Sequence, residues 1–252
     1  MFGGILLPAA LPAILLLLYI YKKDVKDKEP RSLLWRLFLL GGMTIVTAFI
    51  AEVALQNLFG PFLATGSAAA LAVENFLFVA LVEELGKYVV LRKVTWKSEE
   101  FNYTFDAVVY AVASSLGFAT FENVLYLIGA DFSVAIARGL LSVPGHAIDG
   151  VFMGAFYGRA KKCEAEGDLS GKSRNLFLAL LVPTLLHGFY DFCLSMESDV
   201  FLAAFFIFEI AVTAAAIVMV NRLSKDDRMI MQGFGGSGFL SENIFEADRR
   251  LK

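Results

Sequence analysis

Long apolar runs, separated by short polar connections, account for most of this sequence. A helix needs about 20 apolar residues to cross a bilayer. Seven stretches meet that requirement, at approximately 2–20, 33–55, 68–91, 104–128, 132–158, 175–195 and 200–221. The pattern therefore predicts an all-α fold, a polytopic transmembrane helix bundle of about seven spans, with eight as the alternative count.

The connections between these stretches differ in charge. Lys and Arg follow the first, third, fifth and seventh stretches, at Lys22, Lys23, Lys26, Lys28, Arg31, Arg92, Lys93, Lys97, Arg159, Lys161, Lys162, Lys172, Arg174, Arg222, Lys225 and Arg228. The other connections, near 56–67, 129–131 and 196–199, contain neither. Because basic loops stay on the cytoplasmic side, the N-terminus is expected outside and the C-terminus in the cytoplasm. Residues 1–221 then form the transmembrane bundle and residues 222–252 a cytoplasmic tail.

The composition agrees with this assignment. Apolar residues make up 58% of the chain and the mean hydropathy is +0.65, values typical of a membrane protein. The net charge of −3 gives no sign of the basic surface that nucleic-acid-binding proteins use. The lipid bilayer is therefore an expected partner, and nucleic acid is not.

Ionisable side chains interrupt four of the apolar stretches. The only two histidines each precede an aspartate by about one helical turn, in His146-x-x-Asp149 and His187-x-x-x-Asp191. Two other stretches carry Glu83-Glu84-x-x-Lys87 and Phe118-x-x-x-Glu122. An ionisable group in the bilayer interior costs several kcal/mol unless it faces a cavity, a partner or a metal. Four such groups predict a buried polar site, and imidazoles with carboxylates can activate water.

Helical spacing suggests how these residues divide their roles. Glu83 and Lys87 lie four residues apart on one helix face, whereas Glu84 points about 100° away from Glu83. One glutamate can therefore pair with Lys87 while the other acts on substrate or water. In each of the two His–Asp pairs, the carboxylate can accept a hydrogen bond from an imidazole N–H and fix the tautomer.

Depth in the membrane indicates that the two histidines can meet. At about 1.5 Å of rise per residue, His146 and His187 each lie roughly 18 Å from the cytoplasmic end of their helix. Glu83 and Glu84 lie at roughly 12–14 Å, and Glu122 is expected higher, at roughly 22–28 Å. Helix tilt can absorb most of this spread. A single shared site is expected, with Glu122 as its geometrically weakest member.

Other charged residues of the apolar stretches have simpler interpretations. Arg138 is expected near the outer interface, where its side chain can reach water. Glu209 falls near the middle of the last stretch without a partner nearby in sequence. For each intramembrane pair, a purely structural role between helices is the alternative to a catalytic one.

Taken in this order on successive helices, the motifs resemble those of the PrsW family of intramembrane proteases. That family belongs to a wider group with the CAAX prenyl endopeptidases and bacterial abortive-infection membrane proteins. The residues that match its motifs are Glu83, Glu84, Lys87, Phe118, Glu122, His146, His187 and Asp191, with Asn123 directly after Glu122. Asp149 matches no family motif, so its role rests on spacing alone. The resemblance covers about residues 1–221.

The resemblance implies an intramembrane endopeptidase that hydrolyses a peptide bond of a membrane-associated protein. The best-known family role is first-step cleavage of an anti-sigma factor in stress signalling, in the plasma (inner) membrane of a bacterium or archaeon. Candidate catalytic residues are Glu83, Glu84, Glu122, His146 and His187. Candidate supporting residues are Lys87, Phe118, Asn123, Asp149 and Asp191. The oligomeric state does not follow from the sequence.

Two mechanisms remain open. In the first, His146, His187 and Glu122 hold a zinc ion that keeps an open position for water. In the second, no cofactor is needed, because a glutamate acts as general base and a histidine with Asn123 stabilises the oxyanion. The reliance of the wider group on paired glutamates, and the presence of only two histidines, favours the second mechanism.

Two functions other than proteolysis compete with this interpretation. A proton- or ion-coupled transporter also uses intramembrane carboxylates and histidines, but no internal repeat of the transporter kind is visible. A non-catalytic membrane scaffold would keep the fold without the activity. The complete motif set argues against such degeneration.

Overall fold

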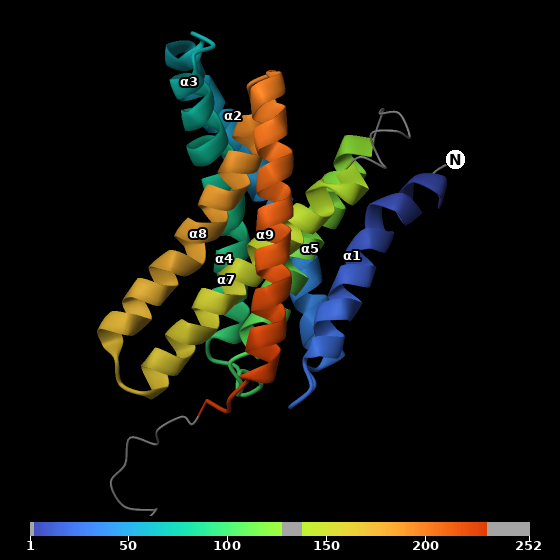
Figure 1. Cartoon of the computed structure of the whole chain (residues 1–252), viewed down its shortest axis with the longest axis vertical. Helices are drawn as coiled ribbons and strands as arrows, with labels where there is room; N and C mark the ends of the chain where they lie inside the picture. Colours follow the sequence, from blue (N-terminus) through green and yellow to red (C-terminus); the bar gives the residue numbers. More distant parts are fainter. Residues whose placement is uncertain (1–2, 128–137, 231–252) are drawn as a thin grey trace, which may run out of the picture.

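The computed structural model describes residues 3–127 and 138–230, which fold into long helices (Figure 1). The elements, in chain order, are α1 (Gly3–Lys23), α2 (Arg31–Leu63), α3 (Ala68–Val73), the π-helix η1 (Glu74–Ala80), α4 (Leu81–Thr95), α5 (Asp106–Leu127), α7 (Ser142–Ala165), α8 (Leu169–Ser195) and α9 (Asp199–Lys225). Within these two ranges no β-strand forms, apart from an isolated bridge between Tyr103 and Met229. The all-α prediction is confirmed.

The helices fill six of the seven predicted stretches almost completely. α3, η1 and α4 follow one another without a break and together cover the third stretch as one rod. By length and composition, α2, α5, α8 and α9 are each apolar enough to cross a membrane. These helices support a membrane-embedded protein, whereas the count of seven spans stays a prediction.

The fifth predicted stretch, 132–158, is not one continuous helix. α7 begins at Ser142, after a turn at Leu141. Pro144 accounts for this start, because proline lacks a backbone N–H and fits the first turn of a helix but not the interior of a longer one. Residues 128–137, which the prediction also includes in large part, lie outside the described residues.

Glycines bring α5 close to its neighbours and so position the site. A Cβ atom at Gly117 of α5 would lie 1.9 Å from the carbonyl oxygen of Phe38 in α2. A Cβ atom at Gly154 of α7 would lie 2.5 Å from the Cα atom of Val108 in α5. Backbones can approach this closely only at glycine, and membrane helices commonly pack in this way. α5 is consequently the central helix, and its residues 107–113 are fully buried.

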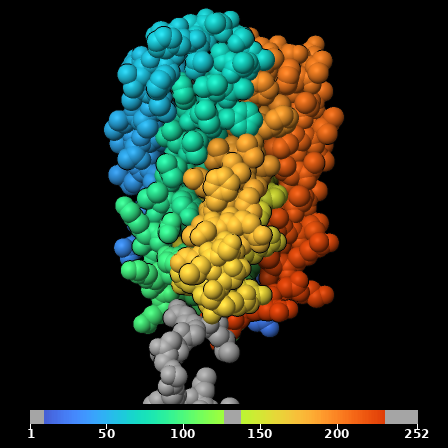
Figure 2. Space-filling view, turned by 90° about the vertical axis from the view of Figure 1, so that its left-hand side faces the viewer, coloured from blue at the N-terminus to red at the C-terminus, as the bar shows by residue number. Residues whose placement is uncertain are grey.

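The outer helices instead expose large apolar side chains. Phe49 of α2 is 64% exposed, and Ile207 and Ile210 of α9 are 70% and 72% exposed. Exposed apolar surface of this kind suits contact with lipid. Figure 2 shows the face on which α8 runs between the rod formed by α3, η1 and α4 and the outer helix α9.

Connections that are far apart in sequence meet at the end of the bundle drawn lowest in Figure 1. Lys23 donates a hydrogen bond of 2.6 Å to Oδ1 of Asn221, and Lys161 donates one of 2.8 Å to the carbonyl oxygen of Trp96. The basic connections therefore share one end of the molecule. Which side of the membrane this end faces stays a prediction, and most of the predicted tail, 231–252, lies outside the described residues.

Candidate active site

The ionisable groups of four apolar helices meet inside the bundle. The rings of His146 in α7 and His187 in α8 have centroids 5.2 Å apart. Both histidines are buried, and so are Glu83 and Glu84 of α4. The two histidines thus share one site, at the matching depths that their positions in the sequence indicate.

The chain reaches the glutamates through a π-helix. η1 ends at Ala80, three residues before Glu83. A π-turn holds about one residue more than an α-turn, so it rotates the residues that follow relative to those before it. Such segments are frequent at functional sites. In the α-helix that follows, Glu84 contacts His187 of α8 and Lys87 contacts His146 of α7.

Lys87 connects the two glutamates to α7. Its ammonium nitrogen lies 2.6 Å from Oε1 of Glu84, 3.5 Å from Oε2 of Glu83 and 3.0 Å from Nδ1 of His146. The centroid of the Phe118 ring lies 4.2 Å from the same nitrogen, close enough for a cation–π contact. Lys87 therefore pairs more closely with Glu84, and Glu83 is the less tightly held of the two glutamates.

The partners of His146 determine its tautomer. An ammonium group only donates, so Nδ1 accepts from Lys87 and Nε2 carries the hydrogen. This N–H donates to Oε2 of Glu122, 3.0 Å away. The sequence predicts Asp149 as the partner of His146, and that prediction is wrong. Both ring nitrogens turn instead to side chains of α4 and α5.

Arg138 fixes the position of Glu122. Its Nη2 lies 2.9 Å from Oε1 of Glu122, and its Nε donates to Oδ1 of Asn123 at 3.0 Å. The guanidinium also lies 3.8 Å from the centroid of the Tyr126 ring. The expectation that Arg138 reaches water at the outer interface misses its ion pair with Glu122. The signal was present, because an arginine inside an apolar stretch needs a partner.

His187 lies between carboxylates on both sides. Its Nε2 is 3.1 Å from Oδ2 of Asp191, one turn further along α8, as the spacing predicts. Its Nδ1 is 3.0 Å from Oε1 of Glu84. Nε2 also lies 3.8 Å from Oε2 of Glu83. Each ring nitrogen can therefore donate to a carboxylate oxygen.

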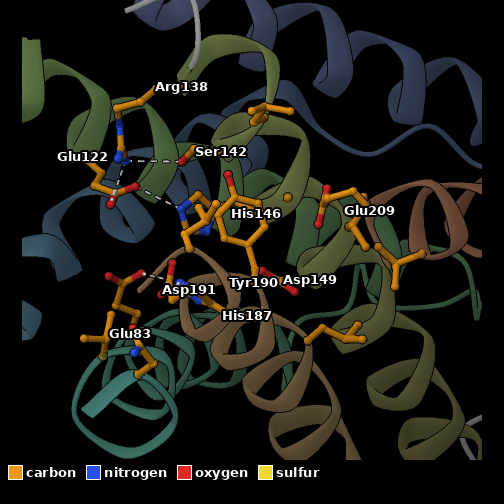
Figure 3. Close-up of a pocket in the computed structure, with 18 of the residues that line it drawn as sticks. Glu83, Glu122, Arg138, Ser142, His146, Asp149, His187, Tyr190, Asp191 and Glu209 are labelled. Atoms are coloured by element: carbon orange, nitrogen blue, oxygen red, sulfur yellow. Dashed lines mark hydrogen bonds and ion pairs between the residues drawn. The ribbon is translucent and has the colours of Figure 1, made fainter. Parts of the chain in front are cut away.

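A cavity of about 570 Å³ opens beside these groups (Figure 3). Its ionisable lining residues are Glu52, Glu83, Glu122, Tyr126, Arg138, His146, Asp149, His187, Tyr190, Asp191 and Glu209. Glu84 and Lys87 are fully buried behind this wall. Glu209, which has no partner nearby in sequence, lines the cavity from α9. A space of this size can hold a short peptide segment.

Comparison with known proteins identifies the family. The sequence profile described as the PrsW family of intramembrane metalloproteases matches residues 29–221. The chain belongs to the PrsW family. Membership makes it an intramembrane protease, and it favours proteolysis over the transporter and scaffold functions.

Bacterial relatives named Protease PrsW match most of the chain. The relative from Oceanobacillus iheyensis is 39% identical over 183 residues, which cover 73% of this chain and 79% of the relative. The relative from Bacillus subtilis is 37% identical over 190 residues, covering 75% and 81%. The relative from Halalkalibacterium halodurans is 34% identical over 225 residues, covering 89% and 99%. No solved structure matches the chain.

The PrsW-family description as metalloproteases raises the question of which residues could hold a metal. Ligand atoms of Glu84, His146, Asp149 and His187 lie within 4.8 Å of one another, and all four residues are buried. Oε2 of Glu84 has no hydrogen-bond partner among the described residues. Imidazole nitrogens and carboxylate oxygens are donors that zinc uses, so this group fits such an ion. Glu122, the third ligand that the sequence predicts, is not in the group and contacts His146 instead.

Proposed function

We propose that this PrsW-family protein is a metal-dependent endopeptidase whose donor group consists of Glu84, His146, Asp149 and His187. The observation that carries the proposal is the convergence of these four residues beside a cavity that can hold a peptide segment. A zinc ion held there would polarise the scissile carbonyl group and lower the pKa of a bound water. The roles of the other polar residues follow from their positions around this group.

Glu83 is the proposed general base. It lines the cavity and does not belong to the donor group, so its carboxylate can reach a water or a substrate. Its Oε2 lies 3.5 Å from Nζ of Lys87 and 3.8 Å from Nε2 of His187. These long contacts leave the oxygen free to accept a proton.

The remaining carboxylates orient the histidines. Asp191 accepts from His187 and Glu122 accepts from His146. A carboxylate bonded to the far nitrogen of a ligand histidine fixes the ring and raises its basicity. Arg138 then acts one step further out, because it holds Glu122.

A metal-independent mechanism is the second candidate, and the position of Lys87 favours it. In that mechanism the ammonium beside Glu84 supplies the positive charge, Glu83 activates water, and a histidine with Asn123 stabilises the oxyanion. Nδ2 of Asn123 has no partner in the described part of the chain and so has a hydrogen to donate. Asn123 does not line the cavity, however, which favours the metal-dependent mechanism.

Metal content and activity of the purified full-length protein distinguish the two mechanisms. We expect bound zinc, loss of reporter cleavage on chelation and recovery on adding zinc. Glu83→Gln should lower the cleavage rate by about 10²–10⁴-fold and keep the metal, whereas His187→Ala should lose both. Glu74→Gln, in η1 and outside the donor group, should keep both. Full activity in a metal-free sample would support the second mechanism.

The proposed substrate is a membrane-spanning anti-sigma factor. Its cleavage by this protein would be the first proteolytic step of a stress-signalling pathway. The support for this substrate is the resemblance of the motifs to the PrsW family. The test compares new protein N-termini in host membranes that contain the wild type or Glu83→Gln at matched expression, at rest and under envelope stress. Wild-type-specific fragments of a membrane-spanning regulator would support the proposal, and fragments of unrelated membrane proteins alone would contradict it.

A further inference from the structure

The ammonium group of Lys87 lies among the donor atoms proposed for the metal. Two of the four donor residues, Glu84 and His146, bind it directly, at 2.6 Å and 3.0 Å. The lysine side chain is fully buried. Within residues 3–127 and 138–230, no other lysine or arginine forms an ion pair with the four donor residues.

A metal ion and this ammonium cannot both use Nδ1 of His146. The Nδ1 lone pair of His146 accepts a hydrogen bond from Lys87, and an occupied lone pair cannot also bind a metal. Two positive charges a few Å apart also repel strongly in a buried site, where the effective dielectric constant is low. A divalent ion can therefore enter only when the ammonium moves away from this nitrogen.

Glu83 offers the ammonium a second position. Its Oε2 lies 3.5 Å from Nζ of Lys87, and no hydrogen bond within the described residues satisfies it. Glu83 lies outside the donor group and on the cavity wall. A small movement towards Oε2 of Glu83 would keep the ammonium paired and release Nδ1 of His146, and the second carboxylate oxygen of Glu83 would then serve as the general base.

We propose that Lys87 is an internal cation that competes with a divalent metal for the donor group and lowers its affinity for the metal. The inference rests on the proposed metal-dependent function. Loading then exchanges one buried cation for another, so the carboxylates are balanced by positive charge before and after the metal binds. Occupancy of the site consequently responds to the concentration of free metal.

Metal titration of the full-length protein in detergent tests this competition. Protein stripped by a chelator is titrated with Co²⁺, followed by visible absorption, and with Zn²⁺, followed by calorimetry. Lys87→Met removes the ammonium while keeping a side chain of similar length. Lys161→Met is the matched control, because Lys161 is also buried but bonds Trp96 and Glu164 away from the donor group. We expect Lys87→Met to bind metal about tenfold more tightly or better, and Lys161→Met to match the wild type.

The outcomes separate this proposal from the proposed function. If Lys87→Met bound metal as tightly as the wild type or more weakly, the proposed competition would be wrong, and the proposed metal site would still be supported. Absence of binding in all three proteins would overturn both. Binding by Lys87→Met alone would support the competition.

A measurement on the wild type covers the case in which Lys87→Met does not fold. Acylation of Lys87 is quantified by mass spectrometry in stripped and zinc-loaded protein, with Lys161 as the internal reference. We expect labelling of Lys87 to rise several-fold with zinc, because the displaced amine moves towards the cavity. Unchanged labelling in protein with measured bound zinc would overturn the proposal.

Discussion

At the scale of residues, the site depends on side chains that orient one another. Asp191 accepts from His187, Glu122 accepts from His146, and Arg138 pairs with Glu122. The first contact joins residues one turn apart on α8, so helical spacing alone predicts it. The other two contacts join different segments of the chain, so helical spacing cannot predict them. Arg138 lies furthest from the histidines in this series of contacts. A substitution of Arg138 therefore tests whether the contacts orient His146.

Arg138→Gln should lower kcat by about 10–100-fold, because Glu122 loses its ion pair and His146 loses its fixed orientation. Arg138→Lys should recover part of the loss, since it restores the charge but not the hydrogen bond to Asn123. The measurement is kcat and KM on a reporter substrate, with metal content as a second reading. Arg159→Gln, on the same helix bundle but away from the cavity, is the control. A change in KM alone would show that Arg138 binds substrate instead.

At the scale of elements, small residues decide which helices meet. Gly41 and Gly117 let α2 and α5 touch backbone to backbone, and Gly154 does the same for α7 and α5. The contact at Gly154 brings α5, which carries Glu122, beside α7, which carries His146. The apolar pattern predicts each helix separately, but not which pairs approach most closely.

Gly117→Ala should destabilise the protein by about 1–3 kcal/mol. The higher helix propensity of alanine, worth about 1 kcal/mol, is outweighed because the new Cβ would meet the backbone oxygen of Phe38, which cannot move aside. Gly60→Ala is the control, since its Cβ would meet only the flexible end of the Gln56 side chain, at 3.0 Å. Thermal unfolding in detergent should show a lower midpoint for Gly117→Ala only. Equal midpoints would contradict the close α2–α5 contact.

At the scale of the whole molecule, buried carboxylates join the connections at one end of the bundle. Glu29, between α1 and α2, accepts a hydrogen bond from the hydroxyl of Tyr110 in α5. Asp227, after α9, accepts from the backbone N–H of Phe105 at 2.8 Å. These contacts tie the first connection to α5 and the segment after α9 to Phe105, directly before α5, so protonation at this end should affect the stability of the bundle.

Burial raises the pKa of Glu29 from 4.5 to about 7. Because the folded protein holds this proton more tightly than the unfolded chain, the stabilisation is complete below pH 4.5 and is lost as the pH rises through about 7. The wild type should therefore unfold at a lower temperature at pH 8 than at pH 5. Glu29→Gln should reduce this pH dependence, and Glu99→Gln, at an exposed position, should not. A pH profile unchanged by Glu29→Gln would contradict the assignment.

Much of the fold and of the candidate site could be predicted from local pattern. Helices fill six of the predicted stretches, because a run of about 20 apolar residues either spans the bilayer or is buried, whichever helices lie beside it. The prediction of one continuous helix over the fifth stretch was wrong. The chain turns at Leu141, and Pro144, which lacks a backbone N–H, lies in the first turn of α7. Among the site residues, Glu83, Lys87 and His187 were recognisable because an ionisable group in an apolar helix needs a reason to be there.

Spacing and hydropathy are properties of single segments, so the sequence established that the chain forms apolar helices that carry histidines, glutamates and a lysine at similar depth. It also determined the PrsW family through the order of its motifs. The packing of the helices places ligand atoms of Glu84 and Asp149, rather than of Glu122, in one close group with those of the two histidines, and it places Lys87 beside this group. These contacts depend on how helices rotate and approach, which glycine contacts and a π-turn set across segments far apart in the chain.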